Sequence, residues 1–377
     1  MKVGFVGFRG MVGSVLINRM ISEGDFKAHN IQTYFFSTSQ AGNKITLPFA
    51  THDTLLDAYN IDELKQMDII VSTQSGTYTN TVFENLRNAG YNGYYIDASS
   101  ALRMRDDTII ALSPVNQDII NHGIQNGIKN FAGGNCSITL SLIGLHGLFR
   151  ENLIKNMSMM TYQAASGAGA LYVRELLKQM AYVVDSNHID IMNDDTTILD
   201  LMNNVGMSIK SDGYPIDNFK TQLAGSVIPW IDMDLNDGSS KEEEKAEAEA
   251  NKIFGLPPQT IKIDGLCIRV GTVRSHCNAI TMQLKEKLSI GEIEKIIKHG
   301  NQWVHYVPNN KTSTMDELNP IYTSNTLNIS VGRLKKSTLG DDIYHVFTVG
   351  DQLLWGASEP LRQVLLSIIN FFDKKVR

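Results

Sequence analysis

Short apolar runs alternate with helical stretches over the first third of the chain. Residues 3–6, 31–36, 67–72 and 94–98 are predicted to be buried strands, and residues 10–20 show the spacing of a helix. Strands that alternate with helices are typical of a parallel sheet covered by helices on both faces. We therefore predict an α/β fold that begins with a Rossmann-like, doubly wound parallel sheet.

Small polar residues follow three of these predicted strands. They are Ser37-Thr38-Ser39, Thr73-Gln74-Ser75 and Ser99-Ser100. Ligands of doubly wound sheets bind at the carboxyl ends of the strands. A ligand site is therefore expected along this edge.

The pattern changes from about Gly133 onward. Longer segments at 157–163, 265–273 and 279–284 predict a mixed sheet with helices, which is an α+β arrangement. The segment 360–372 carries apolar residues at helical spacing, so we expect a helix that covers an apolar surface.

The length of 377 residues suits two domains. We place the first domain at 1–133, completed by a C-terminal helix at 357–377, and the second domain at 134–356. No linker rich in proline or serine separates them, so we expect the two domains to pack together.

Composition excludes several classes of partner. A net charge of -6 gives no basic excess for a nucleic acid, and no apolar stretch is long enough to span a membrane. The first residues lack the pattern of a signal peptide, so we expect a cytoplasmic protein. Cys136, Cys267 and Cys277 are odd in number and lack paired spacing, so we expect neither disulfides nor a bound metal.

A glycine-rich turn follows the first predicted strand. Gly7, Gly10 and Gly13 are spaced three apart, and Arg9, Met11 and Val12 lie between them. Such a turn lets the backbone approach a pyrophosphate, whose charge the amides of the next helix can bind. A tight connection without a ligand is the alternative. The alternating strands and helices that follow favour a dinucleotide.

The end of the second predicted strand bears on the choice of coenzyme. NAD enzymes usually place an acidic residue there, which would repel a ribose phosphate. Here the chain has Ser37, Thr38 and Ser39, with Arg9 available as a cation. We therefore predict NADP, although the hydroxyl groups could instead cap the next element.

Cys136 is the candidate nucleophile. It follows Gly133-Gly134-Asn135 and opens an apolar run, 138–149, that predicts one buried helix. A cysteine in the first turn of a helix has a lowered pKa, which favours the thiolate. The Asn135 side chain could donate to an oxyanion or a phosphate oxygen. The alternative, a small buried hydrophobic residue, is the interpretation we give to Cys267 and Cys277.

Dispersed motifs give the whole chain a resemblance to the aspartate-semialdehyde dehydrogenases of the enterobacterial-like branch. The matching segments are the opening GxxGxxG turn, Phe35-Phe36-Ser37-Thr38-Ser39-Gln40, Asp97-Ala98-Ser99-Ser100, Leu102-Arg103-Met104, Pro114-Val115-Asn116-Gln117, Gly133-Gly134-Asn135-Cys136, Thr161-Tyr162-Gln163-Ala164-Ala165-Ser166-Gly167, Ala224-Gly225-Ser226-Val227-Ile228-Pro229-Trp230, Asp264-Gly265-Leu266-Cys267-Ile268-Arg269-Val270 and Gly350-Asp351-Gln352-Leu353-Leu354-Trp355-Gly356.

The resemblance implies a role for individual residues. Cys136 would form an acyl thioester, His276 would act as the acid and base, and Gln163 would orient the acyl group. Further roles would fall to Arg269 for the substrate carboxylate, Glu242 for its ammonium group, and Arg103 and Lys245 for the phosphate. NADP(H) would lie on the turn from Gly7 to Gly13, and on Thr38, Ser39, Gln74, Ser166, Gly167 and Gln352.

Residue type and spacing alone support some of these roles and not others. Ser240 to Glu243 resembles a capping box at the start of a charged helix, whose ordinary interpretation is a solvated face. Glu242 and Lys245 lie three apart and so share a face of that helix. Arg269 and His276, seven apart, would lie on opposite faces of one straight strand, so we expect a bulge or bend at Gly271. A histidine bonded within the fold is the alternative for His276.

The implied reaction is the NADPH-dependent reduction of aspartyl phosphate to aspartate semialdehyde through a cysteine thioester, a step in the biosynthesis of lysine, threonine, methionine and diaminopimelate. One alternative is another acyl-phosphate reductase, such as one acting on N-acetylglutamyl phosphate. Glu242 argues against it, because an acetylated nitrogen carries no positive charge. A second alternative, a nucleotide-sensing protein without activity, predicts loss of Cys136, His276 and Arg269. The resemblance also implies a homodimer formed across the catalytic domain, and a protein that mainly scaffolds an oligomer is a third alternative.

Overall fold

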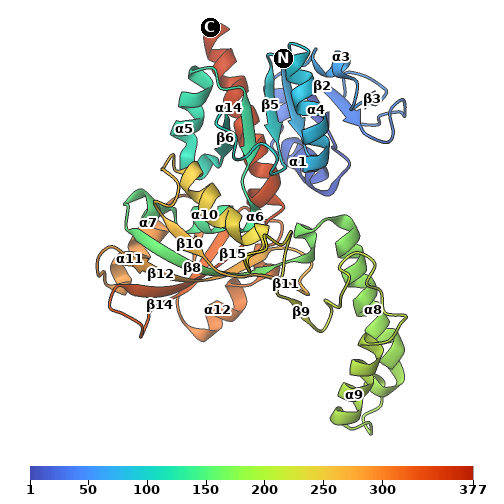
Figure 1. The fold of residues 1–377 in the computed structure, drawn as a ribbon, viewed down its shortest axis with the longest axis vertical. Coiled ribbons are helices and arrows are strands. Elements are labelled where there is room, and N and C mark those ends of the chain that lie inside the picture. Colours follow the sequence, from blue (N-terminus) through green and yellow to red (C-terminus); the bar gives the residue numbers. More distant parts are fainter. Residues whose placement is uncertain (377) are drawn as a thin grey trace.

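A computed structural model describes residues 1–376, which contain two sheets (Figure 1). The first sheet has seven strands, all paired in parallel, in the order β3-β2-β1-β4-β5-β7-β6. Its strands are β1 (Lys2–Val6), β2 (Gln32–Ser37), β3 (Leu56–Asp57), β4 (Ile69–Ser72), β5 (Tyr94–Asp97), β6 (Thr108–Ala111) and β7 (Asn130–Gly133). The predicted doubly wound parallel sheet is confirmed.

Helices cover both faces of this sheet. They are α1 (Met11–Ser22), α2 (Asp25–Ala28), α3 (Ile61–Leu64), α4 (Gly76–Asn88), α5 (Ser113–Gln125) and the C-terminal α14 (Glu359–Val376). Val364 and Ile368 of α14 pack with Ile69 on one face, whereas Val82 of α4 packs with Ile70 on the other. Successive strand residues point to opposite faces, so the uninterrupted apolar run of β4 is buried on both. The apolar side of the C-terminal helix α14 therefore packs against the first sheet, as predicted.

The second sheet is mixed and has eight strands. Its order is β13-β14-β15-β12-β8-β11-β9, and β10 pairs with β8. The strands are β8 (Ile154–Gln163), β9 (Val227–Ile228), β10 (Lys262–Asp264), β11 (Cys267–Val270), β12 (His276–Leu284), β13 (Val304–Tyr306), β14 (Ile329–Lys336) and β15 (Ile343–Gly350). The helical elements of this half are α6 (Cys136–Gly144), α7 (His146–Arg150), η1 (Ala165–Gly167), α8 (Ala170–Met192), α9 (Ile198–Ile209), α10 (Lys241–Ile253), α11 (Ile290–Lys298), α12 (Lys311–Glu317), α13 (Pro320–Thr323) and the π-helical turn η2 (Leu354–Ser358).

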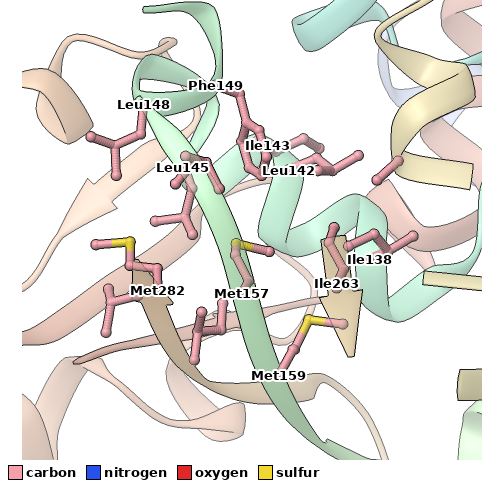
Figure 2. Packing of buried hydrophobic residues seen from close by; sticks show 14 of the residues in the cluster. Ile138, Leu142, Ile143, Leu145, Leu148, Phe149, Met157, Met159, Ile263 and Met282 are labelled. Atoms are coloured by element: carbon pink, nitrogen blue, oxygen red, sulfur yellow. The ribbon is translucent and has the colours of Figure 1, made fainter. Parts of the chain in front are cut away.

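The predicted single helix over 138–149 is wrong. The chain leaves helical geometry at Leu145, where φ is -107° and ψ is 13°, and this residue separates α6 from α7. The turn keeps Leu148 and Phe149 in the same buried cluster as Met157 and Met282 of the sheet (Figure 2). Residues on both sides of the break are therefore buried in one core, and the apolar run alone does not reveal where one helix ends and the next begins.

Helices α8 and α9 form a hairpin that projects from the body of the molecule (Figure 1). No residue of α9 is buried, although the helix carries several large apolar side chains. No helix within residues 1–376 combines the length and apolar character needed to cross a membrane.

We propose the division between the domains where the sequence places it, at 133/134. The last residue of β7 is Gly133, and the first helix of the mixed-sheet half begins at Cys136. The helix α14 returns to the first sheet from the end of β15. Cys136 consequently lies where the two halves meet.

Candidate active site

The glycine-rich turn joins β1 to α1 in the way a pyrophosphate-binding loop requires. Gly7 has a φ of +82°, a conformation that side chains with a Cβ rarely adopt. A Cβ at Gly13 would lie 2.4 Å from the Gly7 carbonyl oxygen, so the helix can approach the turn this closely only with glycine. Helix α1 begins after Gly10 with neither a side-chain cap nor an acidic residue in its first turn. Its first amides are therefore suited to an anion.

The second strand ends in a turn organised by Ser37. The Ser37 Oγ accepts hydrogen bonds from the backbone N–H groups of Ser39 at 3.3 Å and Gln40 at 3.0 Å. The Arg9 guanidinium donates to the Gln40 side chain, so it lies beside this turn. The local capping role that we considered for the hydroxyl groups thus belongs to Ser37, whereas Thr38 and Ser39 remain at least partly exposed beside a cation.

Asn135 holds the start of α6. Its Oδ1 accepts from the N–H groups of Ser137 at 2.9 Å and Ile138 at 3.2 Å, which makes it the N-cap. Its Nδ2 donates to Glu242 at 2.8 Å. The Asn135 side chain therefore caps the helix. Only the second hydrogen of its amide group remains for donation to a reacting oxygen.

Cys136 and His276 face each other. The Cys136 Sγ lies 3.4 Å from His276 Nε2, and the backbone N–H of Ala164 donates to His276 Nδ1 at 3.1 Å. Burial, reinforced by the Glu242 carboxylate, raises the pKa of the Cys136 thiol to about 11. Burial, followed by the charge of Arg269, lowers the pKa of His276 to about 3.

The predicted resting thiolate is therefore wrong for this structure. The helix N-terminus favours the charged thiolate, but desolvation of the partly buried sulfur is the largest cause of the raised pKa. Both shifts favour the uncharged forms, a thiol and a neutral imidazole.

The end of β8 brings Gln163, Arg269 and His276 together. Strand β8 lies between β11 and β12, with Arg269 opposite Gln163 on the parallel side. On the antiparallel side Cys277 is opposite Tyr162, so His276 lies next to the same end of β8. The expected bend at Gly271 is confirmed: the chain bends there after β11 ends, and Arg269 and His276 belong to two strands on either side of β8.

Gly167 shows how closely these groups approach. A Cβ at Gly167 would lie 2.8 Å from Arg269 Nη1 and 2.9 Å from His276 Nε2. Only a residue without a side chain leaves this space open. The Arg269 guanidinium also donates to the Ala164 carbonyl oxygen at 2.9 Å.

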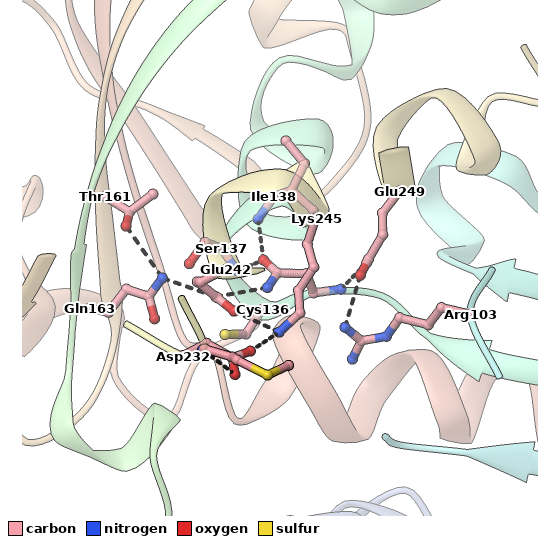
Figure 3. A network of polar contacts seen from close by, with 12 residues as sticks. Arg103, Cys136, Ser137, Ile138, Thr161, Gln163, Asp232, Glu242, Lys245 and Glu249 are labelled. Atoms are coloured by element: carbon pink, nitrogen blue, oxygen red, sulfur yellow. Dashed lines mark hydrogen bonds and ion pairs between the residues drawn. The ribbon is translucent and has the colours of Figure 1, made fainter. Parts of the chain in front are cut away.

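Glu242 is a buried carboxylate among three donors. Its Oε1 accepts from Asn135 Nδ2 at 2.8 Å and from Gln163 Nε2 at 3.1 Å, and its Oε2 accepts from Lys245 Nζ at 3.0 Å (Figure 3). Lys245 also donates to Asp232 at 2.5 Å. The ordinary interpretation of this stretch as a solvated helical face is wrong for Glu242 and Lys245, which share one inward face as their spacing predicts.

Glu249 is a site residue that we did not predict. It is buried, accepts from Arg103 at 3.0 Å, and accepts from the backbone N–H of Asn135 at 2.6 Å. Arg103 further donates to the Gly133 carbonyl oxygen at 2.6 Å. Glu249 follows Glu242 by seven residues, so the helical period places both on one face. That spacing was the available signal.

A cavity of about 520 Å³ joins most of these groups. Its walls include Cys136, Gln163, Arg269, Glu242, Lys245, Arg103 and Asn135, and from the expected cofactor set Val12, Ser166, Gly167 and Gln352. His276 lies behind Cys136 and is fully buried. Within residues 1–376, Gly7, Arg9, Gly10, Met11, Thr38, Ser39 and Gln74 lie outside the cavity wall; of these, Gln74 packs against Gly7.

The first sheet is of the type that binds nucleotides, and a cysteine–histidine pair lies between it and the second, mixed sheet. Together these features define a two-domain oxidoreductase of the NAD(P)-binding class. Residues 2–122 match the family model for the semialdehyde dehydrogenase NAD binding domain, and residues 145–355 match that for the semialdehyde dehydrogenase dimerisation domain.

The structure is also similar to solved structures over nearly its whole length. Aspartate semialdehyde dehydrogenase from Francisella tularensis is 45% identical, with 98% of this chain and 99% of that chain covered and a TM-score of 0.93. Aspartate semialdehyde dehydrogenase II from Vibrio cholerae, complexed with ASA, is 20% identical, with 98% of each chain covered and a TM-score of 0.78. The enzyme from Candida albicans, solved with NADP, is 16% identical, with 98% of each chain covered and a TM-score of 0.65. The latter two show the fold alone.

The chain belongs to the semialdehyde dehydrogenase family and, within it, to the aspartate-semialdehyde dehydrogenases. It is therefore an oxidoreductase, and the resemblance stated from the motifs is confirmed. The alternatives of an N-acetylglutamyl-phosphate reductase and of a nucleotide-sensing protein without activity are not supported.

Proposed function

We propose that the enzyme reduces L-aspartyl 4-phosphate to L-aspartate 4-semialdehyde with NADPH, through a thioester on Cys136. The observation that carries this proposal is the 3.4 Å contact between Cys136 and His276 at a cavity that also contains Arg269 and Glu242. In the opposite direction, with phosphate, the same groups would oxidise the semialdehyde. The reaction would supply the biosynthesis of lysine, threonine, methionine and diaminopimelate.

The chemistry needs a sulfur nucleophile, because hydride does not add usefully to a carboxylate. The Cys136 sulfur attacks the acyl carbon, a C–S bond forms, and the C–O bond to phosphate breaks. The thiol proton leaves with the phosphate, and the His276 ring is the nearest group to guide it. Bound NADPH supplies the hydride that reduces the thioester carbonyl. The resulting thiohemiacetal oxyanion then collapses, the C–S bond breaks and the aldehyde is released, and the Cys136 sulfur takes up a proton from solvent by way of the His276 ring, which restores the thiol.

Opposite charges in the cavity match an amino-acid substrate. We assign the α-carboxylate to Arg269, whose planar guanidinium can form two parallel hydrogen bonds. We assign the ammonium group to Glu242, which already accepts from Lys245. Arg103 and Lys245 are the cations for the phosphate. Each is now paired with a carboxylate, so binding of the phosphate has to compete with Glu249 and with Asp232.

The residues of the first sheet fit a dinucleotide. The Gly7 turn leaves no room for a Cβ, and the uncapped start of α1 offers amide donors for a pyrophosphate. Val12, Ser166 and Gly167 extend from that turn to the Cys136 cavity, where the reactive ring would lie. We assign the extra phosphate of NADP to Arg9, Thr38 and Ser39, since no acidic residue occupies the turn that Ser37 organises.

A phosphate-dependent assay with L-aspartate semialdehyde and either NADP or NAD tests the proposal. We expect reduction of NADP only when phosphate or arsenate is present, and a faster rate than with NAD. Mass spectrometry of enzyme incubated with the semialdehyde and NADP in the absence of phosphate, where the acyl group has no acceptor, should show an acyl adduct on Cys136. Activity that does not need phosphate, or an adduct at another residue, would refute the proposed reaction.

We also propose a homodimer formed by the catalytic domain, acting in the cytoplasm. Support comes from the match to a dimerisation domain over residues 145–355 and from the exposed apolar side chains of the α8–α9 hairpin. These include Leu171, Ile189, Met192, Ile198, Leu199, Met202 and Met207. Sedimentation at micromolar concentration should give a dimer. Leu199→Glu with Met202→Glu should shift it towards a monomer, whereas Ile321→Glu, an exposed apolar site on α13, should not.

A further inference from the structure

Glu175 is a buried carboxylate on α8, outside the groups assigned to the reaction. It is 2% exposed, and it binds two consecutive residues of the loop formed by residues 215–224. Its Oε1 accepts from the backbone N–H of Phe219 at 2.8 Å. Its Oε2 accepts from the backbone N–H of Asn218 and from the Asn218 side-chain amide, the latter at 2.6 Å. A carboxylate is costly to bury unless it is hydrogen-bonded, so these donors both satisfy Glu175 and fix the loop to α8.

Gln179 holds the ends of the same loop. It is fully buried, and its Oε1 accepts from the backbone N–H groups of Leu223 and Ala224, both at 2.9 Å. Its Nε2 donates to the Pro215 carbonyl oxygen at 2.8 Å. Side chains four residues apart lie on one face of a helix. A single face of α8 therefore holds the 215–224 loop at its middle, through Glu175, and at both of its ends.

The 215–224 loop forms part of the wall of the candidate active site. Asn218 and Phe219 line the cavity together with Tyr172, and the rings of Phe219 and Tyr172 meet edge to face with their centroids 4.9 Å apart. After the loop the chain enters β9, where Ile228 lies opposite Arg269 of β11. The loop is thus built onto the strand pair that carries the arginine assigned to the substrate carboxylate.

We propose that Glu175 is a positioning residue for substrate binding: by holding Asn218 and Phe219, it sets the cavity wall on the side of Arg269. This inference rests on the proposed function, in which Arg269 binds the substrate. A loosened wall weakens the fit of the substrate in the ground state and in the transition state alike, because the reacting sulfur is held by other elements. Glu175 therefore controls the KM for the semialdehyde more than it controls kcat.

A substitution of nearly equal size tests this role. Glu175→Gln replaces one accepting oxygen by an NH2 group, which is a donor and so opposes an N–H group of the loop. The KM for L-aspartate semialdehyde should rise roughly fivefold or more, while kcat and the KM for NADP stay within about twofold. Glu286→Gln, the same change at an exposed site after β12, is the control and should match the wild type. A Glu175→Gln enzyme with an unchanged KM for the semialdehyde would overturn the inference.

A double-mutant cycle tests whether Glu175 acts through the loop. Phe219→Ala removes the ring from the cavity wall but keeps the backbone N–H that Glu175 binds, so it should also raise the KM for the semialdehyde. If both changes act on the same wall, the double variant should raise this KM by clearly less than the product of the two single effects. Effects that simply multiply would refute action through Phe219. If Glu175→Gln does not fold, Phe219→Ala still decides: an unchanged KM would remove the loop from the substrate site.

Hydrogen exchange gives a readout that does not depend on turnover. In Glu175→Gln, peptides that span 215–224 should take up deuterium faster than in the wild type, whereas peptides from β1 and α1 should be unchanged. Equal exchange of the loop in the two proteins would show that Glu175 does not hold it. If the wild type lacks phosphate-dependent activity, the proposed function fails. The exchange result then still decides whether Glu175 fixes the loop.

Discussion

The sulfur of Cys136 lies 3.4 Å from Nε2 of His276, although 140 residues separate the two in the chain. Cys136 begins a helix at the junction of the domains, and His276 begins a strand of the mixed sheet. Desolvation raises the pKa of the partly buried thiol to about 11 and lowers that of the fully buried imidazole to about 3. Both shifts favour the uncharged thiol and imidazole in the free enzyme.

Replacing the nucleophile separates chemistry from binding. Cys136→Ala should abolish turnover, while the affinity for NADPH, measured by fluorescence titration, stays within a few fold, because the thiol is the attacking group and not a coenzyme anchor. Cys277→Ala, a buried cysteine in β12, is the control and should retain activity. A Cys136→Ala enzyme with even a tenth of the wild-type rate would contradict the thioester route.

The high pKa of the thiol predicts slow alkylation at neutral pH. The reactive form is the thiolate, so the rate of Cys136 modification by iodoacetamide should rise steadily with pH up to about 11. Because the Glu242 carboxylate contributes to the raised pKa, Glu242→Gln should speed the modification several-fold at pH 8. Glu244→Gln, on the exposed side of α10, should leave it unchanged. Peptide mapping must place the label on Cys136, and a slower rate in Glu242→Gln would refute the charge effect.

Substrate recognition by Arg269 depends on the shape of its side chain. Arg269→Lys keeps the charge but loses the planar two-point contact, and it also disturbs the bond to the Ala164 carbonyl. The KM for aspartate semialdehyde should rise by at least about tenfold in steady-state assays, with little change in the KM for NADP. Arg105→Lys, an exposed arginine paired with Glu84, should behave like the wild type. An unchanged KM would remove Arg269 from the substrate pocket.

The choice of coenzyme should depend on Arg9. Removing this guanidinium beside the Ser37 turn takes away a charge that favours the ribose phosphate. Arg9→Ala should therefore raise the KM for NADP roughly tenfold while the KM for NAD changes little. Lys27→Ala, a surface charge on α2, provides the comparison. Equal effects of Arg9→Ala on the two coenzymes would show that this residue does not distinguish them.

Local patterns in the sequence predicted four of the seven strands of the first sheet. The apolar runs gave β1, β2, β4 and β5 within a residue or two, and the glycine spacing located the turn before α1. These features depend on the nearest neighbours in the chain, namely side-chain period and the backbone freedom of glycine. The spacing of Glu242 and Lys245 on one face of α10 was predictable for the same reason.

Tertiary structure decided the rest of the site. Arg269 and His276 meet because β11 and β12 lie on either side of β8, a strand order that their separation in sequence does not encode. The break at Leu145 is not marked in the apolar run, whose residues on both sides of it pack into one core. The protonation of Cys136 and the ion pair of Arg103 with Glu249 depend on burial among residues distant in the chain. The sequence therefore indicated most of the groups around the cavity, but not Glu249. The electrostatic field and the exclusion of solvent, which shift their pKa values, depend on the assembled fold.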